Sequence, residues 1–538
     1  MKFILLLLLL GVECPGIRAA NILGVFGAHS PSHTIVNMAV MKALADRGHN
    51  ITVVLTAMPK MKAHENITII LAPRTPKRIQ DIKDHVAKAS QRKQSLWKSM
   101  VLTILQSEFQ IEGQYEFLMH PNLRNLYEKP QTKFDLVILG MLANDFQLGI
   151  GAKLNCPVIL TWVRIPMLFA DFVVGNIADP AYVPTMTVGL EPGQKTMGFG
   201  LRLTNFLKYT FSSIFNEVMA YKMNQYYVRA FGNESDPDFP TYSEMKRRIS
   251  LLFYNYHAPS EGPIRPVVPQ SIEIGGIQVK EQPDPLPKDI AEFLDNARDG
   301  AIFFSLGSNV DTNTFSPQVI EIIHKVLSKL TQRVIWKWHD LDDTPGNASN
   351  IYFGKWLPQD DILAHPNTKL FITHAGKGSV AEAQFYGVPM VALPLFGDQP
   401  SNSEILAKSG FGRWLDVHTL TEEDFEKTVL DVMENPTYRK AIGKFSSLYR
   451  DRPLTARQSV VYWTEYVLRH QGAYHLQSPL IQMDFVARNN IDVYGIILFL
   501  GVVASLTILA IFKWVFRKVS RVFHGKNNQQ KVDKLKHN

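Results

Sequence analysis

Short apolar runs alternate with longer amphipathic stretches through the body of the chain. The first set of runs lies at residues 21–27, 51–55, 67–71, 134–139 and 157–162. Between the first two runs, residues 34–46 place apolar side chains at helical spacing. Buried parallel strands read as unbroken apolar runs and need helical crossovers between them. The alternation therefore predicts an α/β fold that opens with strand, helix, strand.

A second set of runs follows a stretch rich in proline and glycine. We interpret that stretch, 259–287, as a linker, and the runs after it lie at 301–306, 333–338, 370–373 and 390–395. Loop or helix signals follow each run, as in a doubly wound sheet. The simplest architecture is two Rossmann-like domains facing each other across a cleft. Residues 449–469 read as an amphipathic helix with Trp463 and Tyr466, which we expect to pack back across the domain junction.

Both ends of the chain carry features of membrane targeting. Residues 1–20 combine Lys2, an apolar block and a small-residue end, as a secretory signal does. A second apolar block, 493–513, is long enough to cross a bilayer as one helix. The expected segments are a signal at 1–20, an N-terminal domain at 21–277, a C-terminal domain at 278–445, returning helices at 446–490, a transmembrane helix at 493–513 and a tail at 514–538.

The net positive charge of the chain lies at its two ends. Residues 513–538 carry a formal +7 and residues 1–20 a formal +1, which account for the formal +8 of the whole chain. The body is therefore near neutral, which argues against nucleic-acid binding. The basic tail predicts a single-pass type I protein whose tail is cytosolic and whose body is lumenal. Lys534 and Lys536 resemble a dilysine signal, which indicates the endoplasmic reticulum membrane.

Composition sets two further limits. Hydrophobic residues make up 46% of the chain and charged residues 20%, which excludes an intrinsically disordered protein. The two cysteines are Cys14, inside the signal, and Cys156, so the mature chain cannot close an internal disulfide. Stability must come from packing.

The most informative stretch runs from Trp356 to Gln399. A strand ends at Thr373, a glycine-containing turn follows, and a helix begins near Gly378. Free amides at a helix N-terminus bind phosphate, and small residues let a diphosphate approach. Around this turn, aromatic, amide, hydroxyl and carboxylate side chains suit a base, a ribose and a sugar. The expected donor-binding residues are Trp356 (base), Gln359 (base or ribose), His374, Gly376, Gly378 and Ser379 (diphosphate), Glu382 (ribose), and Asp398 and Gln399 (sugar).

This stretch resembles the signature of the UDP-glycosyltransferase family, which includes animal UDP-glucuronosyl- and UDP-glucosyltransferases and their plant relatives. The likeness covers nearly the whole chain and includes the strand and loop that end at Ser308, a further donor-binding candidate. It implies a GT-B fold, a metal-independent inverting transfer, donor binding in the C-terminal domain and acceptor binding in the N-terminal domain. No metal and no cofactor are expected, since the UDP-sugar is a co-substrate.

An inverting transfer needs a base for the acceptor hydroxyl, and histidine suits that task near neutral pH. The family has its base sixteen residues before the last residue of an Arg-Gly-His triplet. Here the triplet ends at His49, which makes His33 the candidate; His29 is the alternative. A helix start disfavours imidazolium, which keeps the ring able to accept a proton. We expect His49 itself to lie at the surface, at a helix end.

Two positions depart from the family pattern. The acid that orients the histidine in vertebrate members falls at Gly140, which has no side chain to offer. Asp145 is the nearest following carboxylate and the candidate substitute, although a solvated or helix-capping role fits it equally well. The phosphate turn reads Lys377-Gly378 where plant relatives have Trp-Asn, so one side-chain donor is lost.

The sequence thus predicts transfer of a sugar from a UDP-sugar to a small lipophilic acceptor. The resemblance is nearest to insect members, which favours UDP-glucose over UDP-glucuronate. The alternatives are a UDP-glucuronosyltransferase and a catalytically weak homologue that binds lipophilic molecules at the membrane, which Gly140 favours. The acceptor is expected to be selected by residues 74–125 and 171–239, and the pattern leaves a homo-oligomer open.

Overall fold

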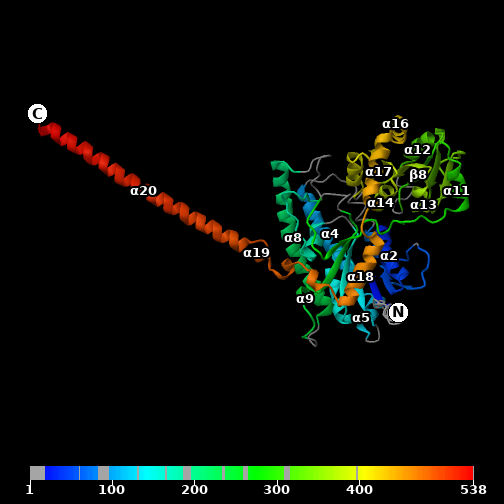
Figure 1. Cartoon of the computed structure of the whole chain (residues 1–538), viewed down its shortest axis with the longest axis horizontal. Coiled ribbons are helices and arrows are strands. Elements are labelled where there is room, and N and C mark those ends of the chain that lie inside the picture. The colour runs from blue at the N-terminus through cyan, green and yellow to red at the C-terminus, as the bar shows by residue number, and fades with distance from the viewer. Residues whose placement is uncertain are drawn as a thin grey trace, which may run out of the picture. The chain divides into compact units, whose positions relative to one another are not determined.

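The computed structural model describes residues 19–28, 30–59, 61–82, 96–129, 133–163, 167–185, 196–232, 237–257, 264–307, 315–395 and 398–536, with the backbone alone for 96–106 and 522–536. The chain divides into two compact units, Met1–Ser478 and Pro479–Asn538. The first unit contains two parallel sheets, each flanked by helices (Figure 1). The expected signal, residues 1–20, lies almost entirely outside the described residues.

The first sheet has the strand order β3-β2-β1-β4-β5-β6-β7, and every neighbouring pair is parallel. The chain therefore starts in the middle, moves to one edge and returns past β1, which is the doubly wound order. The reversal falls between β1 and β4, where open α/β sheets bind ligands. The strands are β1 (Asn21–Phe26), β2 (Asn50–Leu55), β3 (Ile67–Leu71), β4 (Leu136–Gly140), β5 (Val158–Trp162), β6 (Ile249–Tyr254) and β7 (Ser271–Glu273).

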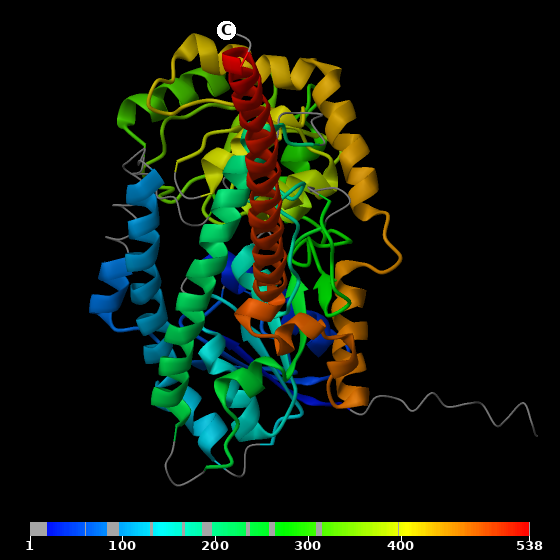
Figure 2. The same ribbon diagram turned by 90° about the vertical axis from the view of Figure 1, so that its left-hand side faces the viewer.

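Alternating residues of β1 fill two separate cores. Leu23 and Val25 pack under α4, α5, α8 and α9, whereas Ile22 and Phe26 pack under α2 and α18. Figure 2 shows α4 and α8 on one side of these strands and α18 on the other. The helical segments of this half are α2 (Pro31–Asp46), α4 (Leu96–Leu118), α5 (Pro121–Glu128), η1 (Asp145–Leu148), α6 (Gly149–Leu154), α7 (Leu168–Val173), α8 (Phe199–Phe231) and α9 (Tyr242–Lys246).

The second sheet repeats the same winding, with the order β10-β9-β8-β11-β12-β13 and parallel pairs throughout. Its reversal falls between β8 and β11. Its strands are β8 (Ala301–Ser305), β9 (Arg333–Lys337), β10 (Ile351–Gly354), β11 (Thr368–Thr373), β12 (Met390–Ala392) and β13 (Gly412–Trp414). Its helices are α11 (Lys288–Asp295), α12 (Pro317–Lys329), α13 (Gln359–Ala364), α14 (Lys377–Tyr386), α15 (Gln399–Lys408), α16 (Glu422–Glu434) and α17 (Pro436–Arg450).

The proline- and glycine-rich stretch between the sheets is more than the linker we expected. Ser271–Glu273 forms β7 and pairs with β6, and Ile277 is fully buried in the core under α2. The strand is only three residues long and lies between turn-forming residues, so no apolar run predicted it.

The helix expected at 449–469 is broken in two. α17 ends at Arg450, Pro453 follows, and Thr455 begins α18 (Ala456–His470) with a capping box. Proline cannot continue a helix, which accounts for the break. Val460 and Val467 of α18 are fully buried beside α2, so this helix completes the core of the first sheet although it follows the second in sequence.

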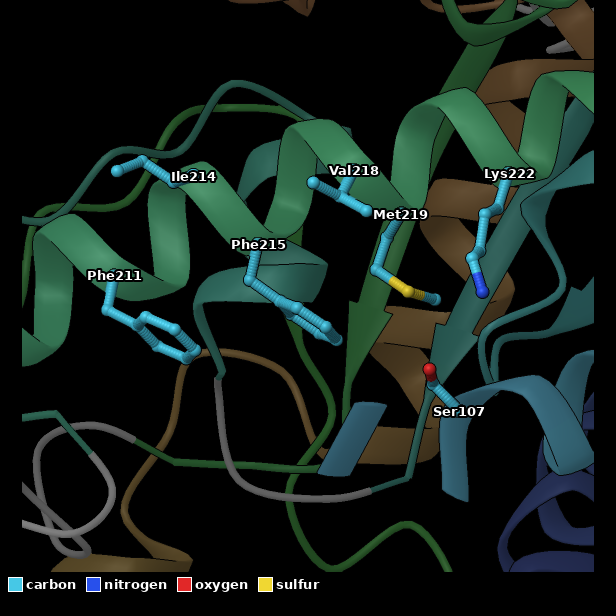
Figure 3. A pocket seen from close by; sticks show the side chains of 7 residues that line it. All are labelled: Ser107, Phe211, Ile214, Phe215, Val218, Met219 and Lys222. Atoms are coloured by element: carbon cyan, nitrogen blue, oxygen red, sulfur yellow. The ribbon is translucent and has the colours of Figure 1, made fainter. Parts of the chain in front are cut away.

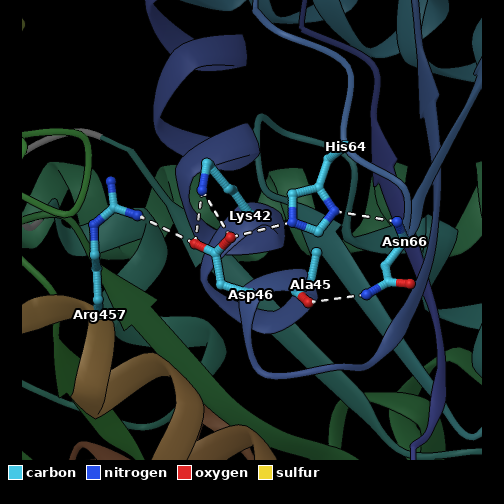
Figure 4. A network of polar contacts seen from close by, with 6 residues as sticks. All are labelled: Lys42, Ala45, Asp46, His64, Asn66 and Arg457. Carbon is cyan, nitrogen blue, oxygen red and sulfur yellow. Dashed lines mark hydrogen bonds and ion pairs between the residues drawn. The ribbon is translucent and has the colours of Figure 1, made fainter. Parts of the chain in front are cut away.

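Polar contacts fasten α18 to the end of α2. The Asp46 carboxylate lies 2.7 Å from Lys42 Nζ and 3.2 Å from His64 Nε2. Its other ion-pair partner is Arg457 of α18, whose Nη1 lies 4.0 Å from Asp46 Oδ2 (Figure 4). Glu465 of α18 accepts a hydrogen bond from Arg47 Nε at 2.9 Å.

His49 is not at the surface, and our expectation for it was wrong. Its side chain is 2% exposed, its Nδ1 accepts from the Ala20 amide at 3.2 Å, and its Nε2 lies 3.7 Å from Glu465. Burial lowers the pKa of His49. One of its contacts, Glu465 of α18, lies more than 400 positions away, which local sequence could not show.

The second unit is helical. It contains η4 (Pro479–Gln482), α19 (Phe485–Arg488) and α20 (Ile491–Lys536). Within α20, Ile491–Arg521 is long and apolar enough to cross a membrane, and an 18-residue window inside it has a mean hydropathy of 2.7. The helix continues beyond the expected span, because the basic residues that follow are also helix formers.

Candidate active site

The turn between β11 and α14 lies at the reversal point of the second sheet. Ala375 has a left-handed backbone with a φ of 59°, and Gly376 is the N-cap of α14. The Ala375 carbonyl accepts from Asn402 Nδ2 at 2.9 Å, and its amide donates to Thr373 Oγ1 at 3.3 Å. These bonds hold an uncommon conformation in place. The first turn of α14 carries no acid, so its free amides present positive potential to an anion.

His374 is packed between two glycines at this turn. A Cβ added to Gly307 would lie 2.6 Å from His374 Cε1, and one added to Gly376 would lie 2.4 Å from His374 Nε2. Burial lowers the pKa of His374 to about 4, against the opposing effect of Asp398. The ring is therefore neutral at physiological pH. Its buried Nδ1 has no hydrogen-bond partner among the described residues.

Gln359, Ser379 and Glu382 form a second group beside the turn. Gln359 Nε2 donates to Ser379 Oγ at 3.1 Å and to the Glu382 carboxylate. Burial, reinforced by the neighbouring Asp360, raises the pKa of Glu382 well above its ordinary value. Burial likewise raises the pKa of Asp360 to about 7. Two neighbouring carboxyl groups with raised pKa values are typical of a functional site.

Trp356 presents its indole to solvent, as the sequence suggested for a base platform. Its side chain is 55% exposed, and Lys337 Nζ lies 5.0 Å from its ring centroid. Lys337 also donates to the carbonyl of Gly307 at 2.9 Å, and Gly307 in the loop after β8 packs against His374. Sequence reasoning missed Lys337. It ends a predicted strand at the carboxyl edge of the sheet, and that position was the available signal.

Asp398 and Gln399 follow β12 and start α15. The Asp398 carboxylate accepts from Asn402 Nδ2 at 2.8 Å, and Gln399 Oε1 accepts from the Leu395 amide at 2.8 Å. Asn402 thereby connects Asp398 to Ala375 of the phosphate turn. Gly378, by contrast, has open space where a side chain would stand.

The described members of the expected donor set thus follow the carboxyl ends of β10, β11 and β12. Ser308 lies outside the described residues. No group of three or more His, Cys, Asp or Glu side chains suited to a metal occurs in the described part of the chain.

The first sheet places His33 at its own reversal point. His33 lies in the first turn of α2, directly after β1, and is half-buried. The first turn of α2 holds no acid. One turn further, Asn37 is 2% exposed, and its Oδ1 accepts from Thr161 Oγ1 at 2.8 Å. His29 lies outside the described residues.

Asp145 has a partner of its own. Its carboxylate accepts a hydrogen bond from the Tyr242 hydroxyl, and burial raises its pKa. Tyr242 belongs to the core under α4, α8 and α9, on the face of the sheet opposite to α2. Its assistance to His33 stays a prediction, and Tyr242 gives this carboxyl a packing role independent of catalysis.

An apolar cavity of about 150 Å³ lies between α4 and α8 (Figure 3). Its walls are six side chains of α8 and Ser107 of α4. The α8 residues are Phe211, Ile214, Phe215, Val218, Met219 and Lys222. Both helices belong to the two segments in which the sequence analysis places acceptor selection.

Comparison with known proteins agrees with this arrangement. The family described as UDP-glucoronosyl and UDP-glucosyl transferase matches residues 23–527. UDP-glucosyltransferase 2 of Dactylopius coccus is 36% identical over 499 residues, which cover 89% of this chain and 90% of that protein. UDP-glucuronosyltransferase 2C1 of Oryctolagus cuniculus is 28% identical over 514 residues, which cover 89% of this chain and 95% of that protein.

Solved structures share the fold at low sequence identity. A UDP-glucosyltransferase from Polygonum tinctorium aligns with a TM-score of 0.53 and 15% identity over 85% of this chain and 99% of that chain. The spinosyn forosaminyltransferase SpnP aligns with a TM-score of 0.50 and 14% identity over 84% of this chain and 100% of that chain. The two Rossmann-like sheets are those of a GT-B glycosyltransferase. The chain therefore belongs to the UDP-glucuronosyl and UDP-glucosyl transferase family and is a UDP-glycosyltransferase.

Proposed function

We propose that this enzyme transfers glucose from UDP-glucose to a hydroxyl group of a small lipophilic acceptor, with inversion at the anomeric carbon. The observation that carries the donor half of the proposal is the phosphate turn. There, the amides of α14, a neutral buried His374 and the Lys337–Trp356 pair border one site. A diphosphate, a ribose and a flat base each find a complementary group in it.

His33 is the base in this proposal. Its imidazole takes the proton of the acceptor hydroxyl while that oxygen forms a bond to the anomeric carbon. The bond from the anomeric carbon to the β-phosphate oxygen breaks, and UDP leaves with the electron pair. The amides at the start of α14 and the ammonium of Lys337 stabilise the charge that develops on UDP. The first turn of α2 keeps the resting ring uncharged, because its dipole disfavours imidazolium.

Glucose is favoured over glucuronate by the relatives. The Dactylopius coccus protein, at 36% identity, is named a UDP-glucosyltransferase, and the rabbit protein named a UDP-glucuronosyltransferase is 28% identical. We propose the apolar cavity between α4 and α8 as part of the acceptor site, since apolar walls suit a lipophilic molecule. We also propose that α20 anchors the enzyme in the endoplasmic reticulum membrane, with the catalytic body lumenal and the basic tail cytosolic.

A second candidate function keeps the fold and loses most of the turnover. Gly140 stands at the position where the resemblance implies an acid in vertebrate members, which favours a weak homologue that binds lipophilic molecules at the membrane. Such a protein would bind UDP and an acceptor and would release UDP no faster in the presence of acceptor than in its absence.

One experiment separates these functions. The full chain in detergent or nanodiscs is assayed for acceptor-dependent UDP release with UDP-glucose and UDP-glucuronate against a panel of phenols and steroids. We expect turnover with UDP-glucose and a loss of roughly 10²–10⁴-fold in His33→Ala, the range for a general base. UDP affinity, measured by calorimetry, should survive in that variant. His418→Ala, at an exposed turn, is the matched control. Turnover retained in His33→Ala would refute the assignment of the base.

A further inference from the structure

Gly140 leaves no empty space at the end of β4. A Cβ built on Gly140 would stand 3.0 Å from Asn37 Nδ2 and 2.8 Å from Phe26 Cδ1. The carboxamide of Asn37 therefore occupies the room into which an acid at position 140 would project.

Asn37 is held in that place by its surroundings. Its side chain is buried, and the Thr161 hydroxyl donates to its Oδ1 at 2.8 Å. Thr161 belongs to β5 and pairs in register with Gly140 of β4. Two neighbouring strands and one helix thus fix the carboxamide at the carboxyl edge of the sheet, beside the reversal point between β1 and β4. Because the hydrogen bond from Thr161 fixes the oxygen of this buried amide, the side chain keeps a single orientation.

Asn37 also shares a helix face with His33. The two residues are four positions apart on α2, which brings their Cβ atoms to about 5–6 Å in a regular helix. Helical side chains lean toward the N-terminus, so the Asn37 carboxamide leans toward the turn that carries His33.

We propose that Asn37, held by Thr161, is the positioning residue for His33 and takes the place of the acid that Gly140 cannot supply. The inference rests on the proposed function, in which His33 is the base. A carboxamide can hold an imidazole in one orientation, as a carboxylate does. It adds no negative charge, however, so it stabilises the imidazolium formed after proton transfer less than a carboxylate would.

The test uses the full chain and three variants. Asn37→Ala removes the carboxamide, Thr161→Val removes the hydroxyl that holds it, and Asn37→Asp keeps the shape and adds a charge. We expect Asn37→Ala and Thr161→Val to lower kcat by about 10–100-fold with UDP affinity and acceptor KM nearly unchanged, because positioning acts on the transition state. Lys42→Ala, on the exposed face of α2, is the control that should keep wild-type kcat.

The pH profile separates positioning from structural support. Asn37→Asp should move the acidic limb of kcat/KM upward by about one pH unit, because a carboxylate near an imidazole favours its charged form. A residue that only packs would leave this limb where it is. UDP affinity of each variant reports that the C-terminal half is folded, and thermal melting reports the N-terminal half. If Asn37→Ala fails to fold, kcat of Thr161→Val and the pH profile of Asn37→Asp still test the role of Asn37.

The outcomes distinguish this inference from the proposed function. Wild-type kcat in Asn37→Ala and Thr161→Val, with an unmoved pH profile in Asn37→Asp, would overturn the role of Asn37 alone. Absence of acceptor-dependent UDP release in the wild type, or full turnover in His33→Ala, would instead overturn the function on which the inference rests.

Discussion

The two Rossmann-like halves have the same winding and opposite kinds of site. In the C-terminal half, polar side chains at four strand ends bond to one another around a helix N-terminus. In the N-terminal half, the described cavity is bordered almost wholly by apolar groups, and α8 exposes large apolar side chains along its length (Figure 3). Those side chains are Phe199, Leu203, Phe206, Leu207, Phe211, Ile214, Val218, Tyr221 and Val228.

The difference fits the proposed function, in which the C-terminal half binds the UDP-sugar and the N-terminal half binds the acceptor. A nucleoside diphosphate has fixed charges and hydroxyls, so its site needs particular donors and acceptors at particular places. A lipophilic acceptor needs apolar area, which many different side chains supply equally well. A donor site can therefore be recognised from a sequence motif, whereas an acceptor site cannot.

The largest expected effect is a loss of UDP affinity, caused by a substitution where Gly376 packs against His374. Gly376→Ala places a Cβ 2.4 Å from His374 Nε2, so the imidazole or the turn must move. Overpacking of this kind costs about 1–3 kcal/mol, and we expect a loss of UDP affinity near the top of that range, about 100-fold. Gly378→Ala is the matched control, because nothing lies within 4 Å of its added Cβ. Calorimetry on both variants checks the result, and equal affinities would contradict the packing argument.

Removal of the Trp356 indole should lower UDP affinity somewhat less. Trp356→Ala removes an exposed indole, and loss of stacking should weaken UDP binding by about 1–3 kcal/mol with little change in melting temperature. Trp414, also exposed but on the edge strand β13, provides the comparison through Trp414→Ala. Fluorescence titration with UDP measures both variants. A similar loss in each would show that the effect is not specific to position 356.

The acceptor half should respond to a change of shape alone. Val218→Trp puts a bulky side chain at the cavity between α4 and α8. We expect acceptor KM to rise by about tenfold, the worth of ~1.4 kcal/mol, while UDP affinity stays constant. Val228→Trp is the control, on the same helix and exposed but away from the cavity. If both substitutions leave KM unchanged, the acceptor binds elsewhere.

The smallest expected effect concerns pH. Burial raises the pKa of Asp360 to about 7, so the folded protein binds a proton there more tightly than the unfolded chain does. The free energy of unfolding should therefore fall as pH rises from about 4 to about 7. Asp360→Asn should remove that fall, whereas Asp340→Asn, at an exposed position, should keep it. Thermal melting at pH 5 and 7.5 measures the difference.

Much of the fold was predictable because buried parallel strands leave unbroken apolar runs. The runs at 67–71 and 301–306 became β3 and β8 almost residue for residue. The three-residue strands β7 and β13 were not predicted, because no apolar run marks them, whereas β12, of the same length, lies inside the apolar run at 390–395. The buried state of His49 escaped for another reason, because it depends on Glu465 and α18 from the far end of the chain.

The candidate site divides in the same way. The residues expected to bind the donor, from Trp356 to Gln399, lie within one stretch, so the sequence placed them after neighbouring strands; donor binding by them stays a prediction. Lys337 lies outside that stretch and was missed, although its place at a strand end was visible. The pairing of Asn37 with Thr161 joins residues 124 positions apart, and only the three-dimensional arrangement shows that it fills the room above Gly140.

The return of α18 to the first sheet constrains how the chain can be made. Ile22 and Leu44 belong to a core that Val460 and Val467 complete, so an emerging polypeptide lacks part of this core until α18 has left the ribosome. At about 5–20 residues per second, the 400-odd residues in between take tens of seconds to synthesise. Throughout that interval the apolar surface that α18 covers lacks its native partner, and a nonsense mutation just before position 456 would remove that partner for good.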